Sequence, residues 1–156
     1  MAAYYQGGSY GFGTEQPKNG CDFLREQIGI KASNRLELSE YVKEGFPYQA
    51  FVSLSESMDL TNKQLAELVQ ISERTLVRRS IVGRLKAEES ERSLRFFRLF
   101  TMAVELFDGD RLAAQGWLAS ESRALQGQSL LEISKTEVGA REVENLITRL
   151  KLGVFT

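Results

Sequence analysis

The stretch from Leu60 to Lys86, LTNKQLAELVQISERTLVRRSIVGRLK, predicts two short helices joined by a tight turn. Thr61 and Gln64 have the spacing of a capping box, in which a hydroxyl and an amide satisfy backbone N–H groups at a helix start. Ser72 is placed to cap the second helix, with the acidic Glu73 in its first turn. This pattern is typical of a helix-turn-helix, which inserts its second helix into the DNA major groove.

The second of these helices combines apolar and basic side chains. Leu76 and Val77 are expected to face inward, while four polar residues are expected to face outward: Arg74, Thr75, Arg78 and Arg79. Arginine suits this position because its planar guanidinium binds both phosphate oxygens and guanine edges. The alternative interpretation is a helix face that merely carries solvated charge. Gln70 weakens the motif, because glycine is often found at that turn position.

The charge distribution favours a local DNA-binding surface on an acidic protein. The 156-residue chain has a formal net charge of −1, which argues against indiscriminate nucleic-acid binding. Residues 61–86 contain six basic and two acidic side chains, a net +4, so the remainder carries −5. This asymmetry fits one surface for DNA and a second surface for another partner.

The composition removes most catalytic chemistry, so we expect no enzyme activity, no cofactor and no metal. The chain has no histidine, the commonest general base and a frequent zinc ligand. Its single cysteine, Cys21, cannot form an intrachain disulfide. No apolar run approaches the roughly 20 residues of a membrane span. Together with an N-terminus unlike a signal peptide, these features predict a cytoplasmic protein.

The remaining sequence predicts an all-α fold without internal repeats. Residues 1–20, rich in glycine and tyrosine, are expected to form a flexible tail. One helix is expected over Leu36–Val42 with Ser39 as a candidate cap. Another is expected to begin at Phe46-Pro47, with the proline at its first position. Its apolar residues repeat on one face, at Phe51, Leu54 and Met58.

A long helix is predicted to begin near Ala87 and to end at Gly109. Its second half is apolar on nearly every side, and such a helix is buried on every side. We expect it to connect a DNA-binding region, residues 21–86, to the rest of a C-terminal region, residues 87–156. Two interpretations of its burial remain, the core of a monomer and packing against a second subunit.

Further caps predict the C-terminal helices. Asp110 and Thr136 each precede a helical stretch, and residues 129–133 are expected to form another short helical turn. The last helix has an apolar stripe and ends at Gly153. The three final residues allow two interpretations. Either Val154 folds back onto the last turn as part of a helix cap, or the end of the chain, with Phe155, is an apolar peg that inserts into a partner.

Taken together, these motifs resemble the Xre-type antitoxins of RES-domain toxin–antitoxin systems. The resemblance rests on LTNKQLAELVQISERTL followed by RRS, GRL and AEESER, and on the later VELF, GWL, SLLEI, GAREVENLI and terminal GVF. The second half is similar to the C-terminal toxin-binding domain shared by Xre and ParS-like antitoxins. The chain departs from the family at Gln70 and where Lys86-Ala87 and Leu130 stand in place of common prolines.

The resemblance implies an antitoxin that binds a cognate RES-domain toxin, which depletes cellular NAD, and blocks its active site. It also implies a homodimer whose helix-turn-helix binds operator DNA and represses the pair's own genes. The residues it implies for DNA contact are Ser72, Arg74, Thr75, Arg78, Arg79 and Arg84. Those implied for toxin contact are Arg149, Lys151, Gly153, Val154, Phe155 and Thr156.

Two other functions compete with this one. A stand-alone helix-turn-helix regulator without a toxin partner would share the DNA-binding motif but would need an effector pocket in the second half. The sequence offers no convergent polar cluster there. An enzyme would need a nucleophile, a general base or a metal motif, and none is present in the sequence.

Overall fold

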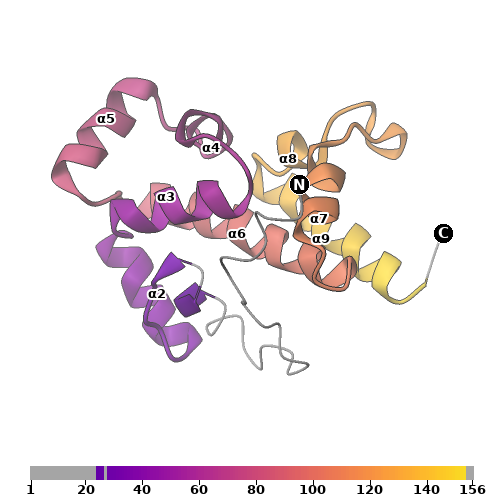
Figure 1. The fold of residues 1–156 in the computed structure, drawn as a ribbon, viewed down its shortest axis with the longest axis horizontal. Helices are drawn as coiled ribbons and strands as arrows, with labels where there is room; N and C mark the ends of the chain where they lie inside the picture. Colours follow the sequence, from indigo (N-terminus) through magenta and orange to yellow (C-terminus); the bar gives the residue numbers. More distant parts are fainter. Residues whose placement is uncertain (1–23, 27, 154–156) are drawn as a thin grey trace, which may run out of the picture.

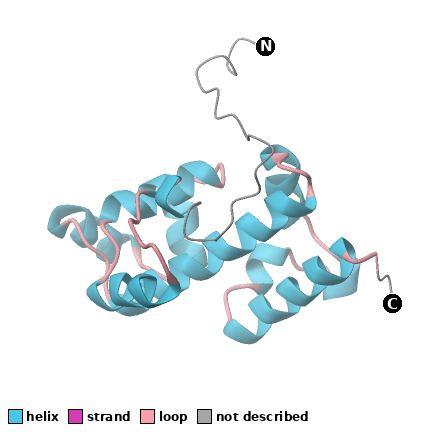
Figure 2. Ribbon diagram, turned by 90° about the horizontal axis from the view of Figure 1, so that it is seen from below, coloured by secondary structure: helices cyan, strands magenta, loops and turns pink. Residues whose placement is uncertain are grey.

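The computed structural model describes residues 24–26 and 28–153, in which all regular secondary structure is helical (Figures 1 and 2). The predicted all-α class is confirmed. The expected tail, residues 1–20, lies outside the described residues. No described helix is long and apolar enough to cross a membrane. The elements are α2 (Arg35–Glu44), α3 (Tyr48–Ser57), α4 (Asn62–Leu68), α5 (Glu73–Val82), α6 (Ala87–Leu106), α7 (Arg111–Ala119), the 3-10 turn η2 (Arg123–Leu125), α8 (Leu130–Ile133) and α9 (Glu137–Lys151).

The long helix α6 runs through the middle of the molecule (Figure 1). Helices α2 to α5 gather about its left-hand part in this view, and α7 to α9 gather about its right-hand part. It packs against α2 and α3 as well as α7 and α9. Its fully buried side chains form the centre of one continuous core: Phe96, Leu99, Phe100 and Ala103. The monomer alone therefore accounts for the burial of these residues.

Most predicted caps are present in the structure. Thr61 and Gln64 form the reciprocal capping box, with hydrogen bonds of 2.9 and 3.1 Å. The side chain of Ser72 accepts from the Thr75 N–H at 3.2 Å. The predicted caps Asp110 and Thr136 are confirmed in the same way, each accepting a backbone N–H bond at the start of its helix. The short helix expected over residues 129–133 is also present, with Ser129 as its N-cap.

Two helices begin within one residue of the predicted position, but the residues that begin them differ from the prediction. Helix α2 is capped by Asn34, whose side chain accepts the N–H groups of Leu36 and Glu37, whereas Ser39 lies inside the helix. Pro47 is the N-cap of α3 and stands just ahead of the first turn. Both differences fall at helix ends, where several polar residues and a proline compete for adjacent positions.

The turn of the helix-turn-helix forms without glycine. Gln70 adopts a left-handed conformation with φ of 59°. The Ile71 N–H donates to the Ala66 carbonyl at 2.8 Å, and the Gln70 N–H donates to that of Glu67 at 3.2 Å. These two bonds define a Schellman motif, in which the left-handed position is most often glycine. Glycine is favoured at such a turn because of its backbone freedom, and Gln70 adopts the same conformation with a side chain.

The linker between α5 and α6 is held against the linker between α2 and α3. The Tyr48 N–H donates to the Gly83 carbonyl, and the Leu85 N–H donates to that of Phe46, both at 2.9 Å. Gly45 is buried with φ of 89°, and a Cβ there would overlap the Leu85 carbonyl oxygen. This close backbone approach requires glycine at position 45 and fixes the C-terminal end of α5.

Candidate DNA-binding and partner-binding surfaces

Helix α5, the second helix of the helix-turn-helix, lies at the edge of the molecule (Figure 1). Residues at spacings of three and four share one face of a helix. Four side chains on that outward face are exposed: Arg74, Val77, Arg78 and Ile81. Neither Arg74 nor Arg78 forms an ion pair with any acidic residue in the part of the chain that the structure describes. Two guanidinium groups are therefore available on this face.

Arg79 does not face outward, and that prediction is wrong. The residue is only 8% exposed, and its side chain forms an ion pair with the carboxylate of Glu89 on α6. Arg79 Nε donates to both Glu89 oxygens at 2.8 and 3.1 Å, and a terminal nitrogen donates to one of them at 2.9 Å. Arg79 lies three residues after Leu76 and therefore shares the inward side of the helix with it, whereas Arg78 lies four residues after Arg74 on the outward side.

Glu89 joins three parts of the structure through one carboxylate. Besides Arg79, it accepts the Lys86 N–H at 2.9 Å and so caps the N-terminus of α6. Burial opposes its ionisation, but the hydrogen bonds from Arg79 and Lys86 outweigh burial and lower the pKa of Glu89 below its ordinary value. The hydrogen bond with Glu89 raises the pKa of Arg79. Both groups are therefore charged, and the pair ties α5 to the central helix.

Val77 also differs from its prediction. Leu76 packs against the core as expected, but Val77 is 59% exposed. The cause is again the helical period, since two adjacent residues cannot both occupy a narrow inward stripe. An apolar side chain therefore stands beside Arg74 and Arg78 on the outward face.

The remaining predicted DNA contacts have structural roles of their own. Ser72 and Thr75 are hydrogen-bonded to each other at the start of α5 through their hydroxyl groups, at 2.9 Å. Arg84 is exposed, and one of its terminal nitrogens donates to the Gly45 carbonyl at 2.7 Å. Across the turn, Lys63 and Glu73 form an exposed ion pair at 2.7 Å. That hydrogen bond lowers the pKa of Glu73 and raises that of Lys63.

The last helix, α9, is anchored to α6 along its length. Its buried stripe consists of Ala140, Val143 and Ile147, each fully enclosed. Three ion pairs join its polar margins to α6: Arg95–Glu137 at 3.1 Å, Arg98–Glu144 at 2.6 Å and Lys151–Glu105 at 2.7 Å. Its first turn also presses against α8, because a Cβ at Gly139 would overlap the Ile133 carbonyl oxygen.

The opposite face of α9 is exposed. Val138 and Leu152 are each 74% exposed, and Asn145 and Arg149 lie between them on the same side. Arg149 has no ionic partner among the described residues, whereas Lys151 is paired with Glu105. Gly153 is exposed with φ of 70°, and the predicted contacts Val154, Phe155 and Thr156 lie outside the described residues. We name Val138, Asn145, Arg149 and Leu152 the outer α9 face.

The two apolar members of the outer α9 face were not among the residues predicted from the sequence. Val138 and Leu152 are fourteen positions apart, close to four helical turns, and therefore share a side. They oppose the stripe formed by Ala140, Val143 and Ile147, which the sequence did identify. The same helical period that located the buried stripe was sufficient to find its apolar counterpart.

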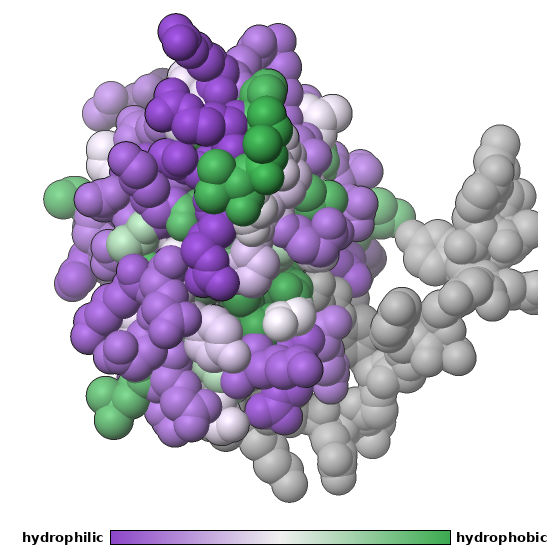
Figure 3. Space-filling view, turned by 90° about the vertical axis from the view of Figure 1, so that its left-hand side faces the viewer, coloured by the Kyte–Doolittle hydropathy of each residue, from purple (hydrophilic) through white to green (hydrophobic). Residues whose placement is uncertain are grey.

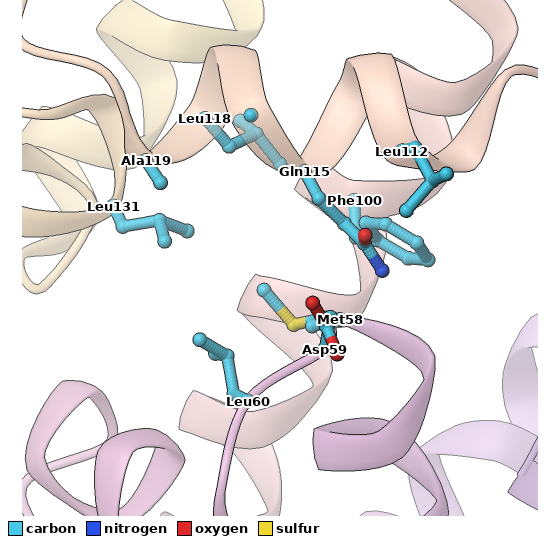
Figure 4. A pocket seen from close by; sticks show the side chains of 10 residues that line it. Met58, Asp59, Leu60, Phe100, Leu112, Gln115, Leu118, Ala119 and Leu131 are labelled. Carbon is cyan, nitrogen blue, oxygen red and sulfur yellow. The ribbon is translucent and has the colours of Figure 1, made fainter.

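A cavity of about 290 Å³ lies between the turn after α3 and helices α7 and α8 (Figure 4). Its lining is mostly apolar and includes Met58, Phe100 and Leu131. The polar side chains of the lining are Asp59 and Gln115, and the Gln115 amide already donates to the Ser57 carbonyl at 2.9 Å. The cavity therefore lacks the converging polar groups with which a small polar effector would be oriented. Within the described residues, no group of three or more Cys, Asp or Glu side chains could hold a metal ion.

Comparison with known proteins gives a consistent result over both halves. Residues 37–98 match the model of the antitoxin Xre-like helix-turn-helix domain, and residues 102–153 match that of the antitoxin Xre/MbcA/ParS C-terminal toxin-binding domain. The chain is 36% identical over 134 residues to a protein named antitoxin Xre from Yersinia enterocolitica. It is 30% identical over 134 residues to another antitoxin Xre from Photorhabdus laumondii. Each alignment covers 85% of this chain and 90% of the relative.

Proposed function

This chain belongs to the Xre antitoxin family, and from that premise we propose that it neutralises an NAD-depleting RES-domain toxin and represses its own operon. The first activity is assigned to the C-terminal region and the second to the helix-turn-helix. The observation that carries the proposal is the presence of two separate unpaired surfaces, the outward face of α5 and the outer α9 face. The two faces belong to helices that lie about different parts of α6 (Figure 1).

For toxin neutralisation, we propose that the outer α9 face docks on the toxin and directs the last residues of the chain into its active site. Two features support this. Two exposed apolar side chains and an arginine without an ionic partner form a mixed surface. Such a surface is better suited to contact with a protein partner than to exposure to water. Leu152 of this face is also followed directly along the chain by Gly153, Val154, Phe155 and Thr156. A segment that fills the active site would exclude substrate without any chemistry by the antitoxin.

For repression, we propose that α5 enters the major groove with Arg74 and Arg78 foremost. Ser72, Thr75 and the exposed Arg84 lie at its two ends, where phosphate groups pass in a helix-turn-helix complex. Arg79 then acts as a positioning residue, because its guanidinium is held by Glu89. Two copies of the chain, about one helical turn or roughly 34 Å apart on DNA, are proposed to bind together, because one copy offers few contacts.

The toxin side is tested by co-expression with the protein encoded beside this gene. The wild-type chain should restore growth and cellular NAD, and Leu152→Asp or removal of residues 153–156 should abolish that protection. Leu36→Asp is the matched control, since Leu36 is 82% exposed but lies on α2. Full protection by both altered proteins, or an unchanged NAD level when the neighbour is expressed alone, would refute this half of the proposal.

The proposed DNA binding is tested by measuring affinity for the promoter region upstream of the gene. The measurement uses the chain alone and the chain in complex with the protein encoded beside its gene. Arg74→Ala and Arg78→Ala should each weaken binding by about 1–3 kcal/mol if the guanidinium contacts a base in bidentate fashion. A phosphate contact would instead weaken binding to all sequences alike and reduce the salt slope by about one. Operator binding by a chain that has no toxin partner would favour the stand-alone regulator.

A further inference from the structure

We infer that Val77 and Ile81 contact thymine methyl groups in the major groove, beside the two arginines Arg74 and Arg78. The inference rests on the proposed operator binding and names the chemical group that the centre of α5 recognises. It concerns sequence specificity, which phosphate contacts cannot supply. The four residues are called the α5 recognition strip.

The geometry of the α5 recognition strip follows from helical spacing. Arg74, Val77, Arg78 and Ile81 are at positions i, i+3, i+4 and i+7, and therefore share one face of the helix, about 100° wide. Val77 is 59% exposed and Ile81 is 81% exposed. Figure 3 shows that apolar side chains gather in a strip among hydrophilic ones at the level where α5 lies in Figure 1. Val82 is also exposed, four residues after Arg78, and lies at the edge of this face that is farthest from Val77.

No structural role accounts for the exposure of these two side chains. The inward side of α5 is occupied by Leu76 and by Arg79 with its partner Glu89. Neither Val77 nor Ile81 belongs to the hydrophobic core or packs on its edge. Two β-branched apolar residues on an exposed helix lower its intrinsic stability slightly, because their side chains are restricted there. They are therefore better explained by a bound partner than by the fold.

The chemistry around the pair selects DNA among the partners that an apolar surface could bind. The arginines of the strip have no ionic partner among the described residues, so the strip is both apolar and positively charged. A two-fold contact between copies of this chain would bring the same arginines face to face, because the same patch is used on both sides. The major groove instead offers phosphates and guanine edges beside the thymine C5-methyl group, which is its apolar feature.

The test removes the methyl groups and leaves the rest of the DNA unchanged. The full-length chain is titrated with the promoter fragment upstream of its gene, both alone and in complex with the protein encoded beside that gene. Thymines within the protected region are then replaced one at a time by uracil, which keeps base pairing and the O4 acceptor. We expect affinity to fall about fourfold for each contacted methyl, the loss typical of one buried methylene-sized group.

The double variant Val77→Ala/Ile81→Ala shows whether these residues are responsible. It should bind the thymine fragment and each uracil fragment equally, about as weakly as wild type binds a fragment in which all the contacted thymines are replaced by uracil. Alanine favours helix and both sites are exposed, so the variant should fold normally. Leu112→Ala is the matched control, because Leu112 is 60% exposed on α7 and should leave the methyl dependence intact.

Each other result contradicts the inference in a recognisable way. Tight promoter binding that is insensitive to uracil at every position would overturn the inference and leave the proposed repression standing. Absence of promoter binding by the chain and by its complex would overturn both. Conversion of a dimer to a monomer by the double variant, with methyl dependence retained, would assign the strip to a contact between copies and overturn the inference.

Discussion

Helices α5 and α9 both present an exposed face to a partner, but different forces hold them in place. The residue that α5 buries is Arg79, and its partner is the charged Glu89. Helix α9 buries an apolar stripe of Ala140, Val143 and Ile147, with ion pairs only at its margins. The orientation of α5 therefore depends on a charge-assisted hydrogen bond, and that of α9 depends on packing.

This difference predicts different sensitivities in the two regions. Removing one partner of a buried ion pair lowers stability strongly, since the other charge stays buried without compensation. Shortening a side chain of a buried apolar stripe lowers stability in proportion to the volume removed, at any pH. The DNA-binding half should thus respond to charge and acidity, and the C-terminal half to side-chain size.

The largest effect is expected for Arg79→Ala, at about 3–5 kcal/mol of unfolding free energy, because Glu89 would remain buried and unpaired. Denaturant unfolding measures the loss. Replacing both partners with leucine should recover most of it, because the unpaired charge is then absent. If the double variant is as unstable as Arg79→Ala, the anchor of α5 is not primarily electrostatic.

A somewhat smaller loss, about 3 kcal/mol, is expected for Ile147→Ala, which leaves a cavity beneath α9. Ile147 is fully buried, whereas Val138 on the other side of the helix is 74% exposed. The matched control Val138→Ala should change stability by no more than about 0.5 kcal/mol. Equal losses for the two variants in thermal unfolding would mean that the outer α9 face is already covered in the free protein.

Acid should weaken the α5 anchor selectively, by less than either truncation, because a protonated Glu89 can still accept hydrogen bonds. The pKa of Glu89 is lowered in the folded protein relative to its ordinary value of 4.5. Its contribution is therefore complete above pH 4.5 and is lost as the pH falls through the folded pKa. Glu89→Gln should flatten this part of the stability profile. An unchanged profile would show that other carboxylates dominate the acid response.

The smallest effect is expected at the turns. Gln70 and Gln126 both have left-handed backbones, with φ of 59° and 60°, one in each half of the molecule. Glycine adopts this conformation without strain, so Gln70→Gly and Gln126→Gly should each raise stability by up to about 1 kcal/mol. Calorimetric melting temperatures would compare the two. A decrease at Gln70 alone would indicate that its side chain contributes to the helix-turn-helix.

Local sequence signals predicted most helix starts because a cap depends on residues only two or three positions apart. Thr61 with Gln64, Ser72 and Thr136 are examples, and each forms the hydrogen bond that its spacing predicts. Asn34 was missed because Ser39 stood nearby as a competing polar residue. The same local logic located the buried stripe of α9.

The candidate DNA-binding face was predicted only in part. Arg74 and Arg78 are exposed as expected. Arg79 was expected to face outward and is buried, whereas Val77 was expected to face inward and is exposed. A stricter use of the helical period places Arg79 beside Leu76 and Val77 beside Arg74. The period does not reveal Glu89, which lies ten residues further along the chain and on another helix.

The sequence by itself determined the helical class, the helix-turn-helix, the long central helix and the Xre antitoxin family, because caps, apolar periodicity and ordered motifs are local properties. Only the tertiary structure decided which arginine is available for DNA and which is fastened to Glu89. It also decided that α6 is buried by both halves of one monomer. The physical reason is that burial and pairing depend on groups brought together across the fold, and a charged side chain has the same local pattern whether its partner is water, DNA or another helix.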